Sequence, residues 1–457
     1  MTASDSRAVD TIAAVATAPG RGAVGLLRIS GPEAAAIAAT ICGRVPEPRV
    51  AGLRRFRDGD GIVIDHGLVL WFPAPNSFTG EAVVELQGHG GPVVLDLLLR
   101  AAVRAGARLA RPGEFSERAF VNGRLDLAQA ESIADLIDAG SQAAVRAASR
   151  SLHGEFSQRV GGLVDALIAL RADLEAALDF ADEDVPWLSS AQMIERLAAL
   201  DQQLAQLLVS AAQGRRLRDG LVVAIAGQPN VGKSTLLNRL AGTDAAIVSP
   251  IPGTTRDVLR EHLVLDGLPV TVLDTAGLRE TRDEIERIGI ERARRAVEQA
   301  ELLLYLVDDR SGVTADDEAL LATLPATVPR RIVHTKCDLS GQPATAVDGV
   351  DDEPGARGNL RLSAATGDGI PSLISALHAA AGLDDTAGDA FGARTRHVDA
   401  LRQAAAEIAQ ARTQGLRSPE LIAEHLRLAQ AALEAITGRY TADDLLGRIF
   451  STFCLGK

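Results

Sequence analysis

A phosphate-binding loop is the clearest chemical signal in the sequence. The stretch GQPNVGKST begins at Gly227, follows the apolar run LVVAIAG, and fits the pattern G-x-x-x-x-G-K-[ST] between an expected strand and an expected helix. Glycines let backbone N–H groups wrap phosphates, Lys233 can offset the phosphate charge, and the Ser234 hydroxyl can bind Mg²⁺. The positive end of the following helix adds to this field. We therefore predict nucleotide contacts from Asn230, Val231, Gly232, Lys233, Ser234 and Thr235.

Two motifs further along the chain have the spacing of switch segments that sense a terminal phosphate. Thr255 in PGTTRD is placed to close over Mg²⁺ and the γ-phosphate. Asp274 in DTAG ends an expected strand and can support Mg²⁺ indirectly, and the N–H of Gly277 can sense the γ-phosphate. The nucleotide contacts predicted from these segments are Pro250, Pro252, Gly253, Thr255, Asp274, Thr275, Ala276 and Gly277.

A guanine-recognition motif follows the switch segments. Asp338 in TKCD can accept hydrogen bonds from the N1–H and the exocyclic amine of guanine, which adenine does not present in that pattern. Lys336 can lay its stem on the base, and the backbone N–H of Ala364, in the run SAA that starts at Ser363, can meet the guanine carbonyl. Thr335 stands where this motif usually has asparagine, which braces neighbouring loops, so we expect somewhat weaker binding with the base preference retained. The order and spacing of the motifs predict that the nucleotide is GTP.

The segments that must position these motifs differ along the chain. Residues 1–120 mix strand-like runs (GAVGLLRIS, GIVIDHGLVLWF and EAVVELQGHGG) with a helical run ended by Gly106, which is typical of an α+β domain. From about residue 125 to 213, apolar residues recur at three- and four-residue steps and predict helices that pack against other helices. Residues 220–380 alternate helices with the strand-like runs LVVAIAG, LPVTVLD, ELLLYLVDD and RRIVHTK, which predicts a doubly wound parallel sheet.

Helical patterns return after about residue 383. In SPELIAEHLRLAQAALEAITG, Ser418 is the expected N-cap, Pro419 fills the first turn and Gly438 follows the end. The economical interpretation is a multidomain α/β protein, in which a discontinuous all-α helical domain is split by an inserted Ras-like P-loop GTPase (G) domain. We predict an N-terminal α+β domain at 1–123, helical parts at 124–218 and 382–457, and the G domain at 219–381. The sequence alone does not prove that the two helical parts pack together.

Composition restricts the class of protein and its surroundings. The chain has 457 residues, 47% of them hydrophobic, and a net charge of −13, so it can form several folded domains while its overall field repels nucleic acid. Bound nucleic acid would need a local basic patch, for which residues 49–57 are a candidate, although a solvated loop is the plainer interpretation. Cys42, Cys337 and Cys454 are too scattered for a disulfide framework or a zinc site. No apolar run is long enough for a membrane span and no signal peptide is apparent, so we expect a cytoplasmic protein without membrane contact.

Along nearly its whole length, the sequence resembles the tRNA-modification GTPases of the MnmE (TrmE) family. The resemblance rests on PGRGAVGLLRISGP, NSFTGEAVVELQGHGGP and ARPGEFSERAFVNGRLDLAQAE, on the GTPase motifs, on GLRETRDEIERIGIERA, and on the terminal FCLGK. It implies a homodimeric GTPase that K⁺ activates when two G domains pair, and an N-terminal domain that dimerises and binds a 5-formyl- or methylene-tetrahydrofolate. It also implies a flavin- and NADH-using partner of the MnmG (GidA) type, in a heterotetramer or larger complex. Together they would add an aminomethyl-type group, such as carboxymethylaminomethyl, to carbon 5 of the wobble uridine of certain tRNAs.

The resemblance also implies roles for residues in the G domain. Asn230 in the P-loop, with Ser249, Ile251 and Thr254 in SPIPGT, matches the positions that hold K⁺ in the family. Such an ion puts positive charge where other GTPases use an arginine finger. Glu286 matches the family's catalytic glutamate, which acts on the attacking water. The alternative for Glu286 is an exposed side chain in the first turn of a helix, where it stabilises the helix dipole.

Folate binding is implied for a second set of residues. Arg28, Glu85, Arg124 and the terminal Lys457 match the family's folate-contacting positions, and Arg124 keeps the charge but not the geometry of the Lys found in some relatives. Without the resemblance, Arg28 would be interpreted as a surface arginine at the end of a strand. Cys454 in FCLGK is either a nucleophile or a buried apolar residue.

Two other classes of function remain open from the sequence. A GTP-gated ribosome-assembly factor would share the G domain but lack folate chemistry. A folate-binding dimerisation scaffold would use its P-loop only structurally. The N-terminal strings and FCLGK favour an enzyme, a GTP hydrolase acting in tRNA modification, over both. Because the chain is acidic and only 3% aromatic, we expect much of the affinity for tRNA to lie in the partner.

Overall fold

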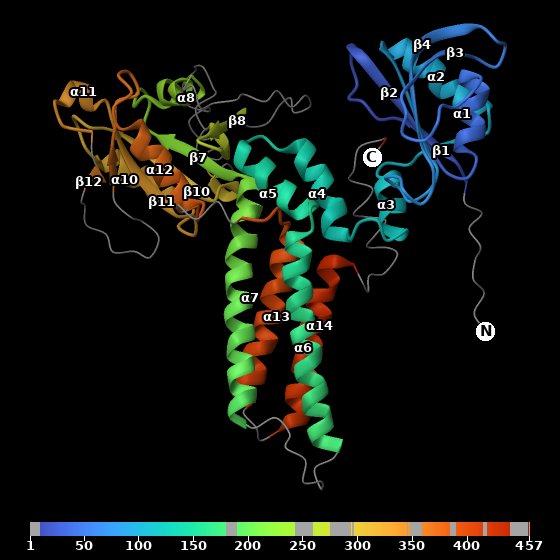
Figure 1. Ribbon diagram of the computed structural model, residues 1–457. Coiled ribbons are helices and arrows are strands. Elements are labelled where there is room, and N and C mark those ends of the chain that lie inside the picture. Colours follow the sequence, from blue (N-terminus) through green and yellow to red (C-terminus); the bar gives the residue numbers. More distant parts are fainter. Residues whose placement is uncertain are drawn as a thin grey trace. The chain divides into compact units, whose positions relative to one another are not determined.

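The computed structural model (Figure 1) describes most of the chain in two compact units. One unit combines Met1–Ala134, Ser157–Ile168 and Arg427–Lys457, and the other combines Asp135–Phe156 with Ala169–Leu426. Among the helices described, none is both long and apolar enough to cross a membrane. The described residues are 10–179, 190–242, 259–274, 294, 297–344, 346–347, 359–383, 390–414, 418–438 and 456.

The first unit contains a mixed sheet with the strand order β3-β4-β5-β2-β1-β6. Neighbouring strands are antiparallel except for β1 and β6, which are parallel. Helices α1 and α2 pack on this sheet and bury an apolar core with it, so the strands and the helix predicted here are confirmed. The elements are β1 (Ile12–Val15), β2 (Gly22–Ser30), α1 (Ala34–Cys42), β3 (Gly52–Arg57), β4 (Val63–Phe72), β5 (Val83–Gly90), α2 (Pro92–Arg104) and β6 (Arg108–Leu109).

The basic stretch at residues 49–57 is not the solvated loop that we expected. Its second half is β3, which lies at the edge of the sheet and pairs with β4. Phe56 is fully buried, and this anchor fixes the strand. The neighbouring arginines bind main-chain oxygens, with Arg54 Nε donating to Arg44 O (3.0 Å) and Arg57 Nη1 to Gly61 O (2.9 Å).

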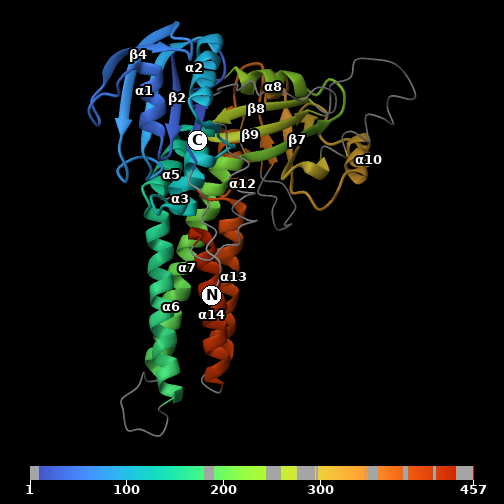
Figure 2. The same ribbon diagram turned by 90° about the vertical axis from the view of Figure 1, so that its right-hand side faces the viewer.

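Helices make up most of the chain between and beyond the sheets. In the second unit, α7 and α13 lie side by side (Figures 1 and 2), so helical segments on either side of the predicted G domain pack together. Helix α14 begins at Pro419 and ends at Thr437, and Gly438 follows with φ +81°, which confirms the predicted start and end. The helices are α3 (Glu114–Val121), α4 (Leu127–Asp138), α5 (Gln142–Leu152), α6 (Glu155–Asp179), α7 (Ser190–Asp219), α13 (Thr395–Gln414) and α14 (Pro419–Thr437).

The second unit also holds the predicted doubly wound sheet, with the order β12-β13-β11-β10-β7-β9-β8. The inner strands are parallel, and β8 and β12 pair antiparallel at the two ends, which the sequence did not reveal. Apolar cores cover both faces of the sheet, as this fold requires. The elements are β7 (Leu221–Gly227), α8 (Lys233–Ala241), β8 (Leu259–Leu265), β9 (Leu268–Asp274), β10 (Leu302–Asp308), α10 (Ala315–Thr323), β11 (Arg330–Thr335), α11 (Cys337–Ser340), β12 (Ala346–Val347), β13 (Asn359–Arg361) and α12 (Ile370–Ala380).

The segments that lead into and out of this sheet region meet at Asp135, in the last turn of α4. Arg218, near the end of α7, donates Nε–H to Asp135 Oδ1 (2.8 Å). Arg394, just before α13, donates Nη2–H to the same oxygen (2.8 Å). Gly214 of α7 lies so close to Phe391 that an added Cβ would collide with the Phe391 carbonyl oxygen. One carboxylate therefore ties both crossings of the chain to α4.

Candidate nucleotide-binding site

The predicted nucleotide motifs meet at the carboxyl ends of the parallel strands. The P-loop follows β7, the TKCD motif follows β11 and the SAA run follows β13. In open α/β sheets, this edge is where ligands bind. Hydrogen bonds join the P-loop to the TKCD loop, and Arg239 of α8, the helix that follows the P-loop, binds the SAA run.

The P-loop backbone has the conformation that its sequence requires. Gly227 has φ +144°, and a Cβ added there would collide with the Leu306 carbonyl oxygen of β10. Gly232 (φ +102°) is left-handed and directly precedes α8. Asn230, a non-glycine residue, is also left-handed with φ +67°, a conformation that asparagine tolerates better than most residues. Such a loop turns its backbone toward the start of α8, where phosphates bind.

Lys233 is the first residue of α8, and its side chain lies along the loop. Its ammonium donates to the carbonyls of Gly227 (2.7 Å) and Gln228 (2.9 Å). Ser234 and Thr235 follow it in the first turn of the helix and are exposed. The amine and the Ser234 hydroxyl are therefore next to the loop that would hold the phosphates.

Thr335 connects the P-loop to the centre of the sheet. Its side chain is buried, with 1% exposure, and its hydroxyl lies 2.5 Å from Val231 O and 3.0 Å from Val307 O. A hydroxyl has one proton, so it donates to one of these carbonyls at a time. Threonine thus makes a loop-bracing contact of the kind that we expected from asparagine, with one donor where an amide has two.

Lys336 makes a second connection between the same loops. It is left-handed (φ +60°), and its ammonium donates to Asn230 O (2.6 Å) and to Asp308 Oδ2 (3.0 Å). Hydrogen bonds from Arg310 and then Lys336 hold the pKa of Asp308 well below its usual range, against the opposing effect of burial. Asp308 thus stays ionised and orients Lys336, a role that the sequence analysis did not assign to it.

Asp338, the predicted guanine acceptor, is exposed on the short helix α11. It lines a cavity of about 450 Å³ together with residues that include Cys337 and Asp368. Asp309 ties α11 to β13, because it accepts hydrogen bonds from Ser340 of α11 and from Nε of Arg361 in β13 (2.8 Å). Partial burial acts to raise the pKa of Asp309, but these two hydrogen bonds lower it overall.

The SAA run forms a tight turn next to α8. Ser363 is buried and its hydroxyl oxygen accepts from the Thr366 N–H (3.2 Å). Arg239 of α8 donates Nε–H to Ala364 O (2.8 Å) and Nη2–H to Ala365 O. Sequence reasoning missed Arg239, because a backbone carbonyl acceptor leaves no signature in a sequence.

Several predicted residues lie outside the part of the chain that the structure describes. They are Ser249, Pro250, Ile251, Pro252, Gly253, Thr254, Thr255, Thr275, Ala276, Gly277, Glu286, Cys454 and Lys457. Asp274 is the last residue of β9, and its backbone pairs with β7 and β8. The assignments of these residues remain predictions.

A second set of predicted residues comes together in the first unit. Arg28 and Glu85 face each other across β2 and β5, and Arg28 donates to Glu85 Oε1 from both Nε (3.0 Å) and Nη2 (2.9 Å). The Arg28 guanidinium lies 5.3 Å from the centre of the Phe78 ring and 5.8 Å from that of Phe115. With 19% exposure and a partner on the next strand, Arg28 is not the surface arginine that we considered.

Of the two remaining folate candidates, Arg124 is exposed, and Lys457 lies outside the part of the chain that the structure describes. A Cβ added at Gly80 would lie 3.3 Å from Cγ of Arg124, and Gly80 is two residues beyond the Phe78 ring at Arg28. Gly456 of FCLGK is buried against the end of β1, where an added Cβ would collide with the Val15 carbonyl oxygen. Since β1 pairs with β2, this glycine of the terminal string lies one strand away from Arg28.

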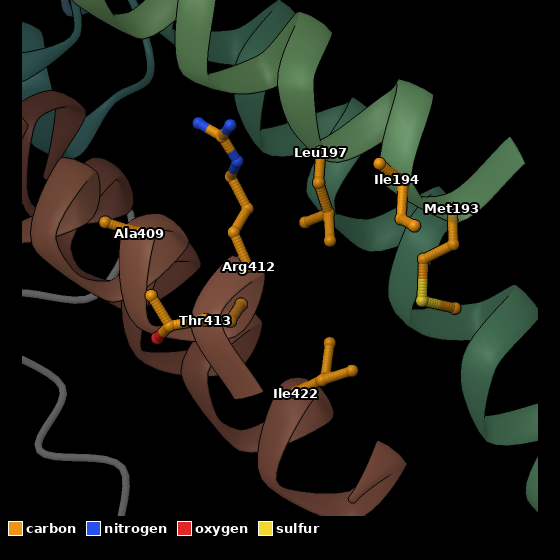
Figure 3. Close-up of a pocket in the computed structure, with 8 residues that line it drawn as sticks. Met193, Ile194, Leu197, Ala409, Arg412, Thr413 and Ile422 are labelled. Carbon is orange, nitrogen blue, oxygen red and sulfur yellow. The ribbon is translucent and has the colours of Figure 1, made fainter. Parts of the chain in front are cut away.

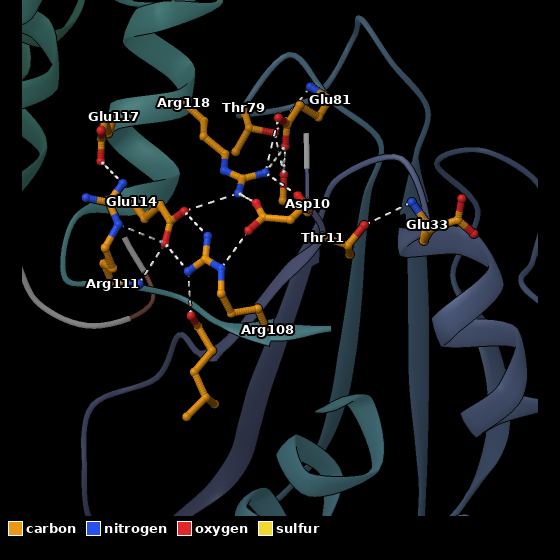
Figure 4. A network of polar contacts seen from close by, with 12 residues as sticks. Asp10, Thr11, Glu33, Thr79, Glu81, Arg108, Arg111, Glu114, Glu117 and Arg118 are labelled. Atoms are coloured by element: carbon orange, nitrogen blue, oxygen red, sulfur yellow. Dashed lines mark hydrogen bonds and ion pairs between the residues drawn. The ribbon is translucent and has the colours of Figure 1, made fainter. Parts of the chain in front are cut away.

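A dense charge network lies in the same unit (Figure 4). Arg118 donates to Glu81 Oε2 (3.0 Å), Glu114 Oε1 (3.1 Å) and Asp10 Oδ1 (2.6 Å), and Arg108 binds Glu114 (2.7 Å) and Asp10 (2.6 Å). Glu114 is only 3% exposed. Burial acts to raise its pKa, but hydrogen bonds from Arg108 and Arg118 lower it overall. The arginines and carboxylates offset one another, which suits a structural brace.

An apolar cavity of about 430 Å³ lies far from these motifs (Figure 3). It is lined from α7, α13 and α14 by side chains that include Met193, Leu197 and Ile422. Met193 is near the start of α7, and at ~1.5 Å per residue the end of the helix is roughly 40 Å away. The cavity contains none of the predicted site residues.

Fold and site together define a P-loop GTP-binding protein, with phosphate and guanine motifs joined at one edge of a doubly wound sheet. Family comparisons extend this class to the whole chain: "GTP-binding protein TrmE N-terminus" matches residues 11–124, and "MnmE helical domain" matches residues 127–454. The chain belongs to the MnmE family of tRNA modification GTPases, which confirms the resemblance, and it is a GTP hydrolase.

Individual relatives agree with this assignment over nearly their full length. The tRNA modification GTPase MnmE of Neisseria gonorrhoeae (strain NCCP11945) is 54% identical, over 98% of this chain and 99% of the relative. That of Laribacter hongkongensis (strain HLHK9) is 55% identical over the same shares. The similarity therefore includes the N-terminal and helical parts as well as the G domain.

Proposed function

We propose that this chain is a K⁺-activated GTPase that pairs through its G domains and, with a flavin-dependent partner, modifies carbon 5 of tRNA wobble uridines. One observation carries the nucleotide part: Thr335 and Lys336 join the P-loop to the guanine motif in a chain of the MnmE family. The relatives are named tRNA modification GTPases, which supports the tRNA part. We propose the cytoplasm as the site of action, because the proposed substrate is tRNA.

GTP would contact all three loops. Asp338 would accept from the guanine N1–H and amine, the Ala364 N–H would meet the guanine carbonyl, and Lys233 would offset charge on the phosphates. Ser234 and Thr255 would hold Mg²⁺, which supplies charge stabilisation to the transferred phosphate. Ser234 fits this role because its hydroxyl is exposed in the first turn of α8, directly after Lys233.

Asn230 would hold K⁺ together with Ser249, Ile251 and Thr254, and the ion would supply positive charge beside the phosphates when two G domains pair. Asn230 fits because it is exposed in the P-loop and carries an oxygen ligand of the kind that such cations accept. We expect turnover in KCl to exceed that in NaCl at equal ionic strength by at least about tenfold, a part of the ~10³–10⁵ that an arginine finger contributes. Asn230→Ala should remove the difference. Equal wild-type rates in the two salts would contradict K⁺ activation.

Glu286 would orient the attacking water. We expect Glu286→Ala to keep its GTP affinity while losing most single-turnover hydrolysis, because only the transition state needs the oriented water. Glu298→Ala is a matched control, since Glu298 is a half-exposed glutamate that pairs with Arg294. Unchanged hydrolysis in Glu286→Ala would leave Glu286 with the helix-dipole role only.

Arg28, Glu85, Arg124 and Lys457 would bind a reduced folate, which carries the one-carbon unit. Support comes from the half-buried Arg28–Glu85 pair, which offers a donor and an acceptor to a pterin edge, and from the buried Gly456 one strand away. Titration calorimetry with 5-formyltetrahydrofolate should show binding that Glu85→Ala abolishes. The exposed helix variant Arg100→Ala should bind like the wild type. Absence of heat from the wild type at high micromolar ligand would contradict the site.

Cys454 is the candidate thiol for the modification reaction. Burial raises the pKa of both Cys42 and Cys337, so these two thiols are poor nucleophiles. We expect Cys454→Ser to abolish tRNA modification and to spare GTP hydrolysis. Wild-type levels of modified uridine in that variant would assign Cys454 a packing role.

The tRNA reaction is tested in cells that lack this chain. Mass spectrometry of their tRNA should show wobble uridines without the aminomethyl-type group, and a copy of the chain should restore it. If the chain were instead a ribosome-assembly factor, cells without it would keep the modified uridines and would accumulate immature ribosomal subunits. Co-purification with a flavin-containing protein checks the proposed partner separately.

A further inference from the structure

We infer that Arg239 is a positioning residue for guanine recognition, which holds the SAA turn so that its backbone N–H meets the guanine carbonyl oxygen. Arg239 is partly buried on α8 and binds Ala364 O (2.8 Å) and Ala365 O through two different guanidinium nitrogens. The inference rests on the proposed guanine site and adds a residue that neither the motifs nor the family resemblance assigned.

The geometry of the peptide bond explains what this contact fixes. In a trans peptide, the C=O and the following N–H point in opposite directions. Arg239 draws the carbonyls of Ala364 and Ala365 toward α8, so the N–H groups of Ala365 and Thr366 point away from it. The Thr366 N–H in turn donates to Ser363 Oγ (3.2 Å). The peptide plane between Ala365 and Thr366 is therefore held at both its carbonyl and its N–H, and the plane between Ala364 and Ala365 is held at its carbonyl.

The turn keeps an unused donor at the expected place. Among the hydrogen bonds of the described residues, none uses the N–H of Ala364, although Ala364 is buried with 7% exposure. Buried backbone N–H groups are almost always paired, so an unpaired one points to a ligand acceptor. The guanine carbonyl oxygen is such an acceptor, and it distinguishes guanine from adenine, which has an amine at that position.

Arg239 lies on the same helix as the phosphate-binding Lys233. Helix α8 begins with the phosphate-binding Lys233 and carries Arg239 near its end, so one rigid element supports both the phosphate loop and the base-binding turn. Charge-assisted hydrogen bonds from a guanidinium are stronger than neutral ones, which suits a turn that must keep one conformation. Arginine with two donors at fixed spacing fits two successive carbonyls better than lysine does.

Nucleotide analogues separate this role from general stability. 6-Thioguanosine diphosphate replaces the carbonyl oxygen with a weaker acceptor, and inosine diphosphate lacks the exocyclic amine that Asp338 would bind. For the wild type we expect each change to weaken binding by about 5- to 10-fold, the size of one hydrogen bond. In Arg239→Ala, GDP should bind about 5- to 10-fold more weakly, the thio penalty should fall below about 2-fold, and the inosine penalty should stay unchanged.

The controls are chosen on the same helix and sheet. Arg239→Lys should restore part of the thio penalty, and Arg330→Ala, an exposed arginine of β11, should behave like the wild type for all three nucleotides. An Arg239→Ala protein that keeps the full thio penalty, or that loses both penalties together, would overturn the positioning role. A wild-type protein that binds ADP as tightly as GDP would instead overturn guanine recognition itself.

Discussion

The nucleotide-binding site and the N-terminal charge network are built from different kinds of contact. At the nucleotide site, Thr335 and Arg239 donate to main-chain carbonyls of neighbouring loops. In the N-terminal unit, Arg118 binds the carboxylates of Glu81 and Glu114, and the partners are side chains on both sides of each contact. A contact between a side chain and a main-chain carbonyl requires one particular residue, whereas a contact between two side chains requires two.

This difference has consequences for stability and for function. A carbonyl acceptor is supplied by any residue, so a side chain that binds it positions a loop whatever residue the loop contains. A buried charge pair depends on the identity of both residues, because removing one partner leaves an unpaired charge in a poorly solvated place. We therefore expect changes at the nucleotide site to alter affinity, and changes in the network to alter the free energy of unfolding.

Arg118→Ala should produce the largest effect. Arg118 is 13% exposed and serves three carboxylates, so its loss should lower the free energy of unfolding of the N-terminal unit by about 3–5 kcal/mol. Urea unfolding measures this, followed by fluorescence of Trp71, in β4, in a Trp187→Phe background that removes the other tryptophan. GDP affinity should not change. Arg100→Ala, which breaks an exposed pair with Asp96, is the control and should cost less than about 1 kcal/mol.

Lys233→Ala tests the opposite side of the comparison. We expect GTP affinity to fall at least 100-fold, about 2.7 kcal/mol, because the amine that lies along the P-loop is removed. The thermal midpoint should move little, since Gly227 O and Gln228 O belong to a partly exposed loop. Lys233→Arg should not rescue binding, because a planar guanidinium does not fit the place of a compact amine. A loss of stability without a loss of affinity would contradict the expectation that residues at the nucleotide site act on affinity.

Thr335 braces the P-loop through a single hydroxyl. Thr335→Val keeps the shape but leaves the Val231 and Val307 carbonyls without this donor, so GDP affinity should fall about fivefold, or ~1 kcal/mol. Thr335→Asn supplies two N–H donors and should bind GDP more tightly than the wild type. The exposed Thr323→Val serves as the control. If the asparagine variant bound more weakly than the valine variant, the bracing role would be wrong.

Asp10 gives the smallest effect and a pH dependence. Hydrogen bonds from Arg108 and then Arg118 lower its pKa from 3.8 to about 2, against the effect of burial. A lowered folded-state pKa stabilises the fold above pH ~4, and this contribution disappears as the pH falls toward 2. Because Asp10 is half exposed, we expect less than about 1 kcal/mol. Thermal unfolding of Asp10→Asn between pH 2 and 7 should show a weaker pH dependence than the wild type, and identical profiles would remove Asp10 from the network's stabilising charges.

Much of the fold could be read from the sequence where local patterns decide. β7 and β9 occupy the predicted runs, β10 and β11 lie within theirs, and α14 begins and ends at its predicted cap residues, because apolar runs and caps act over a few residues. β3 was missed because its pattern, GLRRFR, shows only Leu53 and Phe56 among charges. Whether that segment forms a strand depends on the burial of Phe56, which is a tertiary effect.

The site shows the same division. Lys233, Asp338 and the glycines of the P-loop were predicted, since phosphate and guanine chemistry fixes those residue types at fixed spacing. Arg239 and Asp309 were not, because their contacts join segments that are distant in sequence and end on a carbonyl or on another loop. Such partners exist only once the sheet has brought the loops to one edge.

The junction at Asp135 makes the nucleotide-binding region a module with adjoining ends. Since Arg218 and Arg394 meet on one carboxylate oxygen, a short peptide could bridge the two chain ends there without rerouting α7 or α13. Close termini are the condition under which one domain can be spliced into another. The geometry therefore marks where an engineer would cut to exchange the nucleotide-binding region for another domain.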